Sequence, residues 1–143
     1  MPSEVNDLEL LEIVQNLADI ADDISMRYAR LTNVHVETKA DNTPVTQADK
    51  DVEIALRDYL SGIQPGVTVV GEECNPDVPT DGKYWVIDPI DGTKNFIRGV
   101  PVWATLIAYV ESQHPYIGMV SAPMLGRRWW GSPGLGAFTS DLH

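Results

Sequence analysis

The sequence predicts an α+β fold in which layered helices pack on a mostly antiparallel sheet. Two amphipathic patterns fill the first half of the chain, and short apolar runs separated by turn residues fill the second half, as is typical of strands. With 143 residues, of which 43% are hydrophobic, the chain can bury one core of modest size. We therefore expect residues 1–143 to form a single domain.

A long amphipathic helix is predicted from Ser3 to about Arg30, with Ser3 as its N-cap. Acidic residues in its first turns suit the positive end of the helix dipole. Apolar residues recur at intervals of three and four positions along it: Leu8, Leu11, Val14, Leu17, Ala18, Ala21, Ile24 and Tyr28.

A second helix is predicted from about Gln47 to Ser61, after a short strand at Asn33–Glu37 and a loop at Thr38–Pro44. Thr46 followed by Asp49 has the spacing of an N-cap with an acidic residue at the third helical position. The apolar face of this helix contains Val52, Ala55, Leu56, Tyr59, Leu60 and Ile63.

Short strands are predicted in the remainder of the chain. The first of them is continuously apolar and β-branched, so we expect it to be buried on both faces. The predicted strands are Val67–Val70, Tyr84–Ile87, Val102–Val110, Tyr116–Val120 and Arg127–Trp130.

Composition excludes several classes of function. The chain has 10 basic and 21 acidic residues, and a net charge of −11 repels nucleic-acid phosphates and anionic lipid headgroups. The same negative charge favours the binding of divalent metals and cationic small molecules, although an acidic surface can also simply keep a protein in solution. No apolar run approaches the ~20 residues that span a bilayer. One cysteine, Cys74, and an N-terminus without a secretion signal predict a cytoplasmic protein.

Carboxylates follow two of the predicted strands: Glu72 and Glu73 after the first, Asp88 and Asp91 after the second. If these strands are parallel neighbours, the acids gather at one end of the sheet, where only protons or cations offset their repulsion. Mg²⁺ accepts such oxygen ligands, and Pro89 stiffens the spacing. Read separately, Asp91-Gly92 also suits a tight turn and the glutamates a solvated loop.

Gly92 and Thr93 open a predicted short helical segment, whose free N–H groups suit a phosphate. The Thr93 hydroxyl could orient a water molecule, with Asp49 as its base. Asp49 has an alternative role in a capping box. The chain lacks a Walker A motif, a dinucleotide fingerprint, a calcium loop and a nucleophile elbow. His35, His114 and His143 are not spaced as metal ligands.

Three motifs together resemble the inositol monophosphatase-like superfamily of Mg²⁺-dependent phosphatases. They are Pro44–Asp49, Gly71–Glu73 and Trp85–Thr93, and they occur in the order and spacing of that superfamily. The resemblance implies the N-terminal portion of the sugar phosphatase fold. It also implies that Glu72 and the Ile90 carbonyl bind a first metal, that Asp88 bridges two metals and that Asp91 binds the second. By the same resemblance, Asp49 and Thr93 activate a water molecule and the Gly92 and Thr93 amides bind phosphate. Glu73 and Lys39 are expected to lie near the site.

Residues 94–104 and 121–130 look most like the bacterial histidinol-phosphate phosphatases of this fold. The resemblance implies hydrolysis of histidinol phosphate to histidinol, in histidine biosynthesis. Inositol phosphate and 3′-phosphoadenosine 5′-phosphate are alternative substrates. The family resemblance also suggests that the protein forms a homodimer and binds a small phosphorylated metabolite. Arg127–Trp130 is either a strand, exposed and then buried, or a substrate contact.

One departure from the superfamily concerns its later Trp-Asp motif, whose aspartate completes the second metal site. The chain reaches His143 before such a motif. We therefore expect an N-terminal portion without the C-terminal α/β half, weakly active or inactive alone, with an exposed apolar surface. The alternative of another class is a truncated, non-catalytic metal-binding module that pairs with a partner chain through an open sheet edge.

Overall fold

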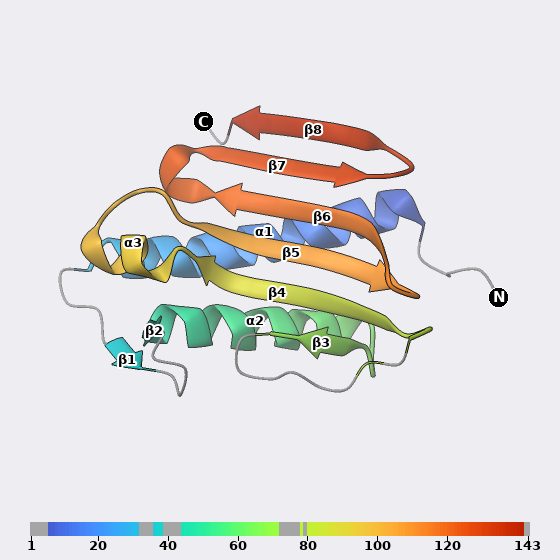
Figure 1. The fold of residues 1–143 in the computed structure, drawn as a ribbon, viewed down its shortest axis with the longest axis horizontal. Helices are drawn as coiled ribbons and strands as arrows, with labels where there is room; N and C mark the ends of the chain where they lie inside the picture. Colours follow the sequence, from blue (N-terminus) through green and yellow to red (C-terminus); the bar gives the residue numbers. More distant parts are fainter. Residues whose placement is uncertain (1–5, 32–35, 39–43, 72–77, 79, 142–143) are drawn as a thin grey trace.

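The computed structural model describes residues 6–31, 36–38, 44–71, 78 and 80–141. Figure 1 shows these residues as helices and strands in one compact arrangement. In chain order the elements are α1 (Asp7–Ala29), β1 (Val36–Thr38), β2 (Pro44–Thr46), α2 (Gln47–Ile63), β3 (Thr68–Val70), β4 (Lys83–Asp91), α3 (Thr93–Arg98), β5 (Ala104–Glu111), β6 (His114–Ala122), the 3₁₀ turn η1 (Pro123–Leu125), β7 (Arg127–Ser132) and β8 (Gly136–Asp141).

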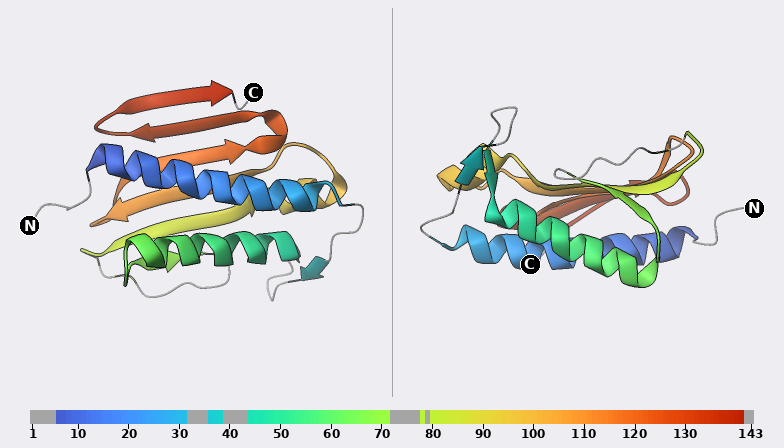
Figure 2. Two further views of the ribbon diagram at one scale, coloured as in Figure 1. Left: turned by 180° about the vertical axis from the view of Figure 1, so that it is seen from behind. Right: turned by 90° about the horizontal axis from the view of Figure 1, so that it is seen from below.

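The main sheet has six strands in the order β3-β4-β5-β6-β7-β8, which is also their order in the chain. Only the β3–β4 pair is parallel, and each later pair is antiparallel. Both long helices lie against one face of this sheet (Figure 2). The predicted α+β architecture with a mostly antiparallel sheet is confirmed. None of the described helices is long and apolar enough to cross a membrane.

The first helix begins later than the sequence pattern predicts. Asn6 is its N-cap, and the Asn6 side chain accepts a hydrogen bond from the Glu9 backbone N–H at 2.9 Å. The prediction of Ser3 as the cap is therefore wrong for this helix, and Ser3 itself lies outside the described residues. Asparagine and serine cap equally well, so the cap is set by where the buried stripe begins.

The second helix begins where predicted, with Thr46 and Asp49 forming a reciprocal capping box. It ends at Ile63, beyond the predicted Ser61, because Gly62 in its last turn costs only about 1 kcal/mol relative to alanine. The Gln64 N–H then donates to the Leu60 carbonyl at 2.8 Å.

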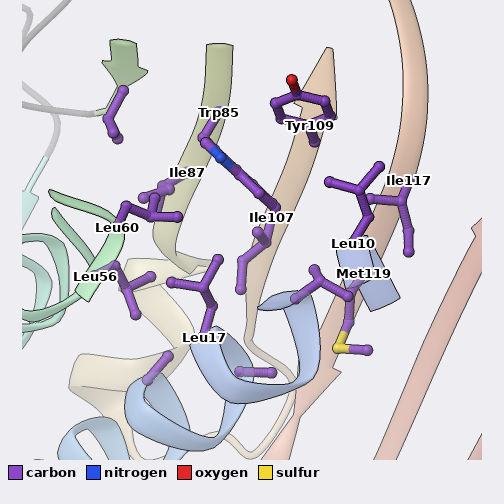
Figure 3. Close-up of a cluster of buried hydrophobic side chains, with 14 of the residues drawn as sticks. Leu10, Leu17, Leu56, Leu60, Trp85, Ile87, Ile107, Tyr109, Ile117 and Met119 are labelled. Carbon is purple, nitrogen blue, oxygen red and sulfur yellow. The ribbon is translucent and has the colours of Figure 1, made fainter. Parts of the chain in front are cut away.

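The hydrophobic core lies between the two long helices and the sheet (Figure 3). Trp85 is its largest fully buried side chain; its ring centroid is 4.9 Å from that of Tyr109, and its Nε1–H donates to Gln64 Oε1 at 2.9 Å. Most of the apolar positions predicted on both helices belong to this core or pack against it, together with alternate residues of β4, β5 and β6: Ile87, Ile107, Ile117 and Met119. Leu8 and Ile63 do not, since they are 69% and 43% exposed, and Leu10, which was not predicted, is buried.

Three strand predictions need correction. Pro44–Thr46 is a strand, β2, because it pairs with β1 across the predicted loop. Among the described strands β3 is an edge strand, and only its central Val69 is buried, so burial on both faces is wrong. β8 was not predicted, because its residues are nearly all exposed and show no apolar alternation.

The hairpin between β5 and β6 turns through two residues with positive φ, Ser112 at 50° and Gln113 at 67°. Both values suit a type I′ turn, for which Asn-Gly is the preferred pair. Changing Ser112-Gln113 to Asn-Gly should therefore raise the free energy of unfolding by about 1 kcal/mol, measured by urea denaturation. The single change Gln113→Ala keeps a β-carbon at positive φ and should give no gain; an equal gain there would contradict this explanation.

Candidate metal site

A β-bulge near the end of β4 places two aspartates on one face of the sheet. Asp88 lies opposite Leu106 and Asp91 opposite Ala104, so β4 has one more residue than β5 over this stretch. Residues opposite each other share a face, and Leu106 and Ala104 lie on the same face. In a regular strand, residues three apart would point to opposite faces. Residues 88–91 therefore form a bulged strand, and the turn predicted at Asp91-Gly92 begins only at its end, where Gly92 is a turn residue.

Buried contacts on both sides fix this bulge. The Thr105 hydroxyl, which is fully buried, donates to the Pro89 carbonyl at 2.8 Å. Ile90 packs in a small cluster with Ala48, Phe96 and Trp103. Sequence reasoning missed Thr105. A polar residue at an inward position of an alternating strand, before Ile107, was the available signal, because a buried hydroxyl needs an acceptor.

Gly92 connects the bulge to α3 and needs to be glycine. Its φ is +90°, and a β-carbon there would lie 3.2 Å from the Val102 carbonyl oxygen. Thr93 is the first residue of α3, as the sequence predicts, and its hydroxyl donates to the Ile90 carbonyl at 3.0 Å. The turn thus holds the Thr93 hydroxyl close to the backbone that joins Asp88 to Asp91.

Asp49 lies at the N-terminus of α2, and its side chain is buried. Its Oδ2 accepts hydrogen bonds from the backbone N–H and the hydroxyl of Thr46, both at 3.0 Å. The capping role is confirmed. The neighbouring Ala48 contacts the Ile90 cluster, so this end of α2 lies beside the bulge (Figure 1). A role of Asp49 as a base stays a prediction.

The strands expected to bring the acids together are parallel neighbours. Val70, the last residue of β3, pairs with Val86, two positions before Asp88. Glu72, Glu73 and Lys39 lie outside the described residues. Among the residues that the structure does describe, no three His, Cys, Asp or Glu side chains are grouped as metal ligands. The prediction for Glu72 therefore stays open.

Comparison with known protein families shows to which family this chain belongs. The profile of the inositol monophosphatase family matches residues 6–143. The chain belongs to the inositol monophosphatase family. Members of this family are metal-dependent phosphatases.

Two curated relatives in this family are histidinol-phosphatases. That of Streptomyces coelicolor is 50% identical over 143 residues, covering 97% of this chain and 52% of the relative. That of Mycobacterium tuberculosis is 51% identical over 125 residues, covering 87% of this chain and 48% of the relative. The chain thus spans about half the length of the curated relatives it matches.

Solved structures of inositol monophosphatase family members share the fold. The Thermotoga maritima IMPase is 30% identical with a TM-score of 0.82, covering 92% of this chain and 51% of that structure. An IMPase/NADP phosphatase solved with Mg²⁺ and phosphate is 21% identical with a TM-score of 0.82, covering 93% of this chain and 51% of that structure. At 21% identity, the similarity to the second structure shows a shared fold and nothing more.

The donor set of the bulge suits the hard cation of this family. Asp88 is half-buried and Asp91 exposed, so one carboxylate can bind deep in the site and the other near solvent. With the Ile90 carbonyl between them, the candidate ligands that the structure describes all offer oxygen atoms, as Mg²⁺ prefers. The residues present therefore fit the metal in chemistry.

The part of this sheet face next to Asp88 is mainly apolar. No described helix covers this face of the sheet (Figure 2). An open recess of about 580 Å³ lies on this face, and Trp129, which lines it, is 40% exposed. The predicted exposed apolar surface is thus present in the described part of the chain. From this face the recess is lined by Val86, Asp88, Leu106, Ala108, Gly118, Val120, Trp129, Gly131 and Ala137.

Arg127–Trp130 forms part of β7, so the interpretation as a strand is confirmed, but the expected change from exposed to buried is wrong, because Arg128 is buried and Trp129 exposed. Arg128 is buried and its guanidinium binds Asp19 and Asp22 of α1 at 2.7 and 2.8 Å. Trp130 stacks on Phe138 of β8 with ring centroids 5.8 Å apart. These side chains join α1, β7 and β8.

Proposed function

We propose that this chain is the N-terminal portion of a Mg²⁺-dependent phosphomonoesterase that hydrolyses histidinol phosphate. The observation that carries the proposal is the bulge of β4, which puts Asp88 and Asp91 on one face beside the Gly92-Thr93 turn. The identity of about 50% with two histidinol-phosphatases supports the substrate. A net charge of −11 suits the cationic amine and imidazole of that substrate.

The protein groups divide into metal ligands and water-handling groups in this proposal. Glu72, Asp88, Asp91 and the Ile90 carbonyl would hold Mg²⁺. When bound, Mg²⁺ supplies positive charge that offsets the phosphate and activates water. Because Asp88, Asp91 and the Ile90 carbonyl all lie on one short bulge, they would keep that charge in a fixed place.

Asp49 and Thr93 would handle the proton of the attacking water. The water oxygen bonds to phosphorus while the bond from phosphorus to the ester oxygen breaks on the opposite side. The water proton passes through the Thr93 hydroxyl to Asp49, and the leaving alkoxide takes a proton from solvent. The amides of Gly92 and Thr93 would orient the phosphate during this displacement. We further propose a cytoplasmic homodimer, as the family resemblance and the single cysteine suggest.

A substrate comparison tests this proposal on the protein encoded by the complete reading frame. With Mg²⁺, kcat/KM for histidinol phosphate should exceed that for inositol phosphate and 3′-phosphoadenosine 5′-phosphate by at least about tenfold, because pockets that bind substrate polar groups discriminate strongly. Chelation by EDTA should abolish turnover, and added Mg²⁺ should restore it. No turnover of any substrate would overturn the proposal and favour the non-catalytic module that pairs with a partner chain through an open sheet edge.

A further inference from the structure

Gly71, the residue before the predicted ligand Glu72, is in close contact with a buried carboxylate of α2. A β-carbon built on Gly71 would lie 2.6 Å from both Cδ and Oε1 of Glu53 and 2.8 Å from its Oε2. Gly71 is not among the glycines with positive φ, so its backbone does not require glycine. The space taken by Glu53 is therefore the reason for glycine at this position.

The Glu53 carboxylate cannot simply move away from a larger residue. Its side chain is 6% exposed, and Arg57 Nε donates to its Oε2 at 3.0 Å, one helical turn along α2. The same guanidinium donates from Nη1 to the Val69 carbonyl in β3 at 3.0 Å. Arg57 therefore fixes the carboxylate and the centre of β3 to each other, two residues before Gly71, and Gly71 packs against that fixed group.

We propose that the Glu53–Arg57 pair is a positioning device for the metal site. The pair holds the main chain at Gly71, and the peptide bond that leaves Gly71 carries Glu72. A shift at Gly71 is thus transmitted directly to a residue predicted to bind Mg²⁺. The inference rests on the proposed function, because it assigns Glu53, Arg57 and Gly71 to the support of that same site. None of the three needs to touch metal or substrate.

The test measures Mg²⁺ affinity by isothermal titration calorimetry, on the protein encoded by the complete reading frame. Gly71→Ala should weaken Mg²⁺ binding by about 10- to 100-fold, the usual effect of losing support around a metal ligand. Glu53→Asp withdraws the carboxylate by one methylene. Combined with Gly71→Ala, it should make room for the new methyl group and bind Mg²⁺ about fivefold more tightly than Gly71→Ala alone.

Gly62→Ala is the matched control, because a β-carbon there meets nothing within 4 Å. It should leave Mg²⁺ affinity unchanged. Thermal unfolding without metal distinguishes a role in positioning the metal site from a role in folding. If Gly71 is merely structural, Gly71→Ala should lower Tm without weakening Mg²⁺ binding. That result would overturn the inference. Additive effects in the double variant would also overturn it. A wild-type protein that binds no Mg²⁺ would overturn the proposed function and this inference together, whereas tight binding by wild type and variants alike would overturn only this one.

Discussion

Asp88→Asn should abolish Mg²⁺ binding and phosphatase activity while the protein stays folded. The change keeps the shape of the side chain but removes the negative charge that Asp88 would supply as the proposed bridging ligand. We expect activity to fall by more than about 100-fold, the upper range for residues that merely orient a ligand. Folding should survive, because Asp88 is half-buried beside an apolar recess, where a neutral side chain is cheaper to bury.

Calorimetric titration with Mg²⁺ and steady-state kinetics check this expectation, with thermal unfolding as the measure of folding. Asp58→Asn is the matched control, since Asp58 is an exposed carboxylate on α2. It should leave both Mg²⁺ affinity and turnover unchanged. Retained activity in Asp88→Asn would show that the bridging role is wrong, and a lower Tm with normal Mg²⁺ binding would make Asp88 a structural residue.

Arg128→Met should reduce the free energy of unfolding by about 3 kcal/mol at pH 7, because one partner of a buried charge pair is removed. Arg128 donates to Asp22 at 2.8 Å and to the Ser121 hydroxyl at 3.0 Å. The Asp22 side chain is 14% exposed, so its charge would stay buried without a partner. Chemical denaturation would measure the loss.

The pH dependence of that loss follows from Asp22. Burial raises the pKa of Asp22 above its ordinary value, and the hydrogen bonds from Arg128 and Ser121 oppose the rise. Without Arg128 the pKa of Asp22 rises further. The folded variant then binds a proton more tightly than the unfolded chain, so its stability increases as pH falls through the raised pKa of Asp22 toward the ordinary aspartate value. The deficit relative to wild type should therefore shrink on acidification.

Arg127→Met provides the matched control for Arg128→Met. Arg127 pairs with Asp141 at 2.7 Å, but both side chains are largely exposed, so the loss should be only about 0–1 kcal/mol. The double change Arg128→Met/Asp22→Asn should recover most of the stability lost in Arg128→Met. A deficit that grows on acidification, or an equal loss in Arg127→Met, would contradict the explanation.

The two long helices could be predicted because their evidence is local. A stripe of apolar residues every three or four positions, with Thr46 and Asp49 at one start, needs no knowledge of distant partners. Edge strands lack such evidence. The residues of β8 are almost all exposed, so nothing in their sequence distinguishes a polar edge strand from a loop.

The sequence pointed to candidate site residues, whose ligand roles stay predictions, but it could not give their geometry. The spacing of Asp88 and Asp91 indicated paired ligands, and Gly92 and Thr93 lie where the motif places them. The bulge depends on the register with β5, which no local pattern encodes. The contact between Glu53 and Gly71 likewise joins two elements, so it appears only in the fold.

The bulge of β4 also affects how the site can change during evolution. Pro89 and Ile90 have no partner residues in β5, which releases their carbonyl groups from the ladder. Thr105 binds the first of these oxygens, and the second, on Ile90, is the predicted main-chain ligand. A ligand supplied by the backbone survives every substitution of its own side chain. Sequence drift at position 90 could thus alter packing while the oxygen remains, whereas a single mutation can delete either aspartate.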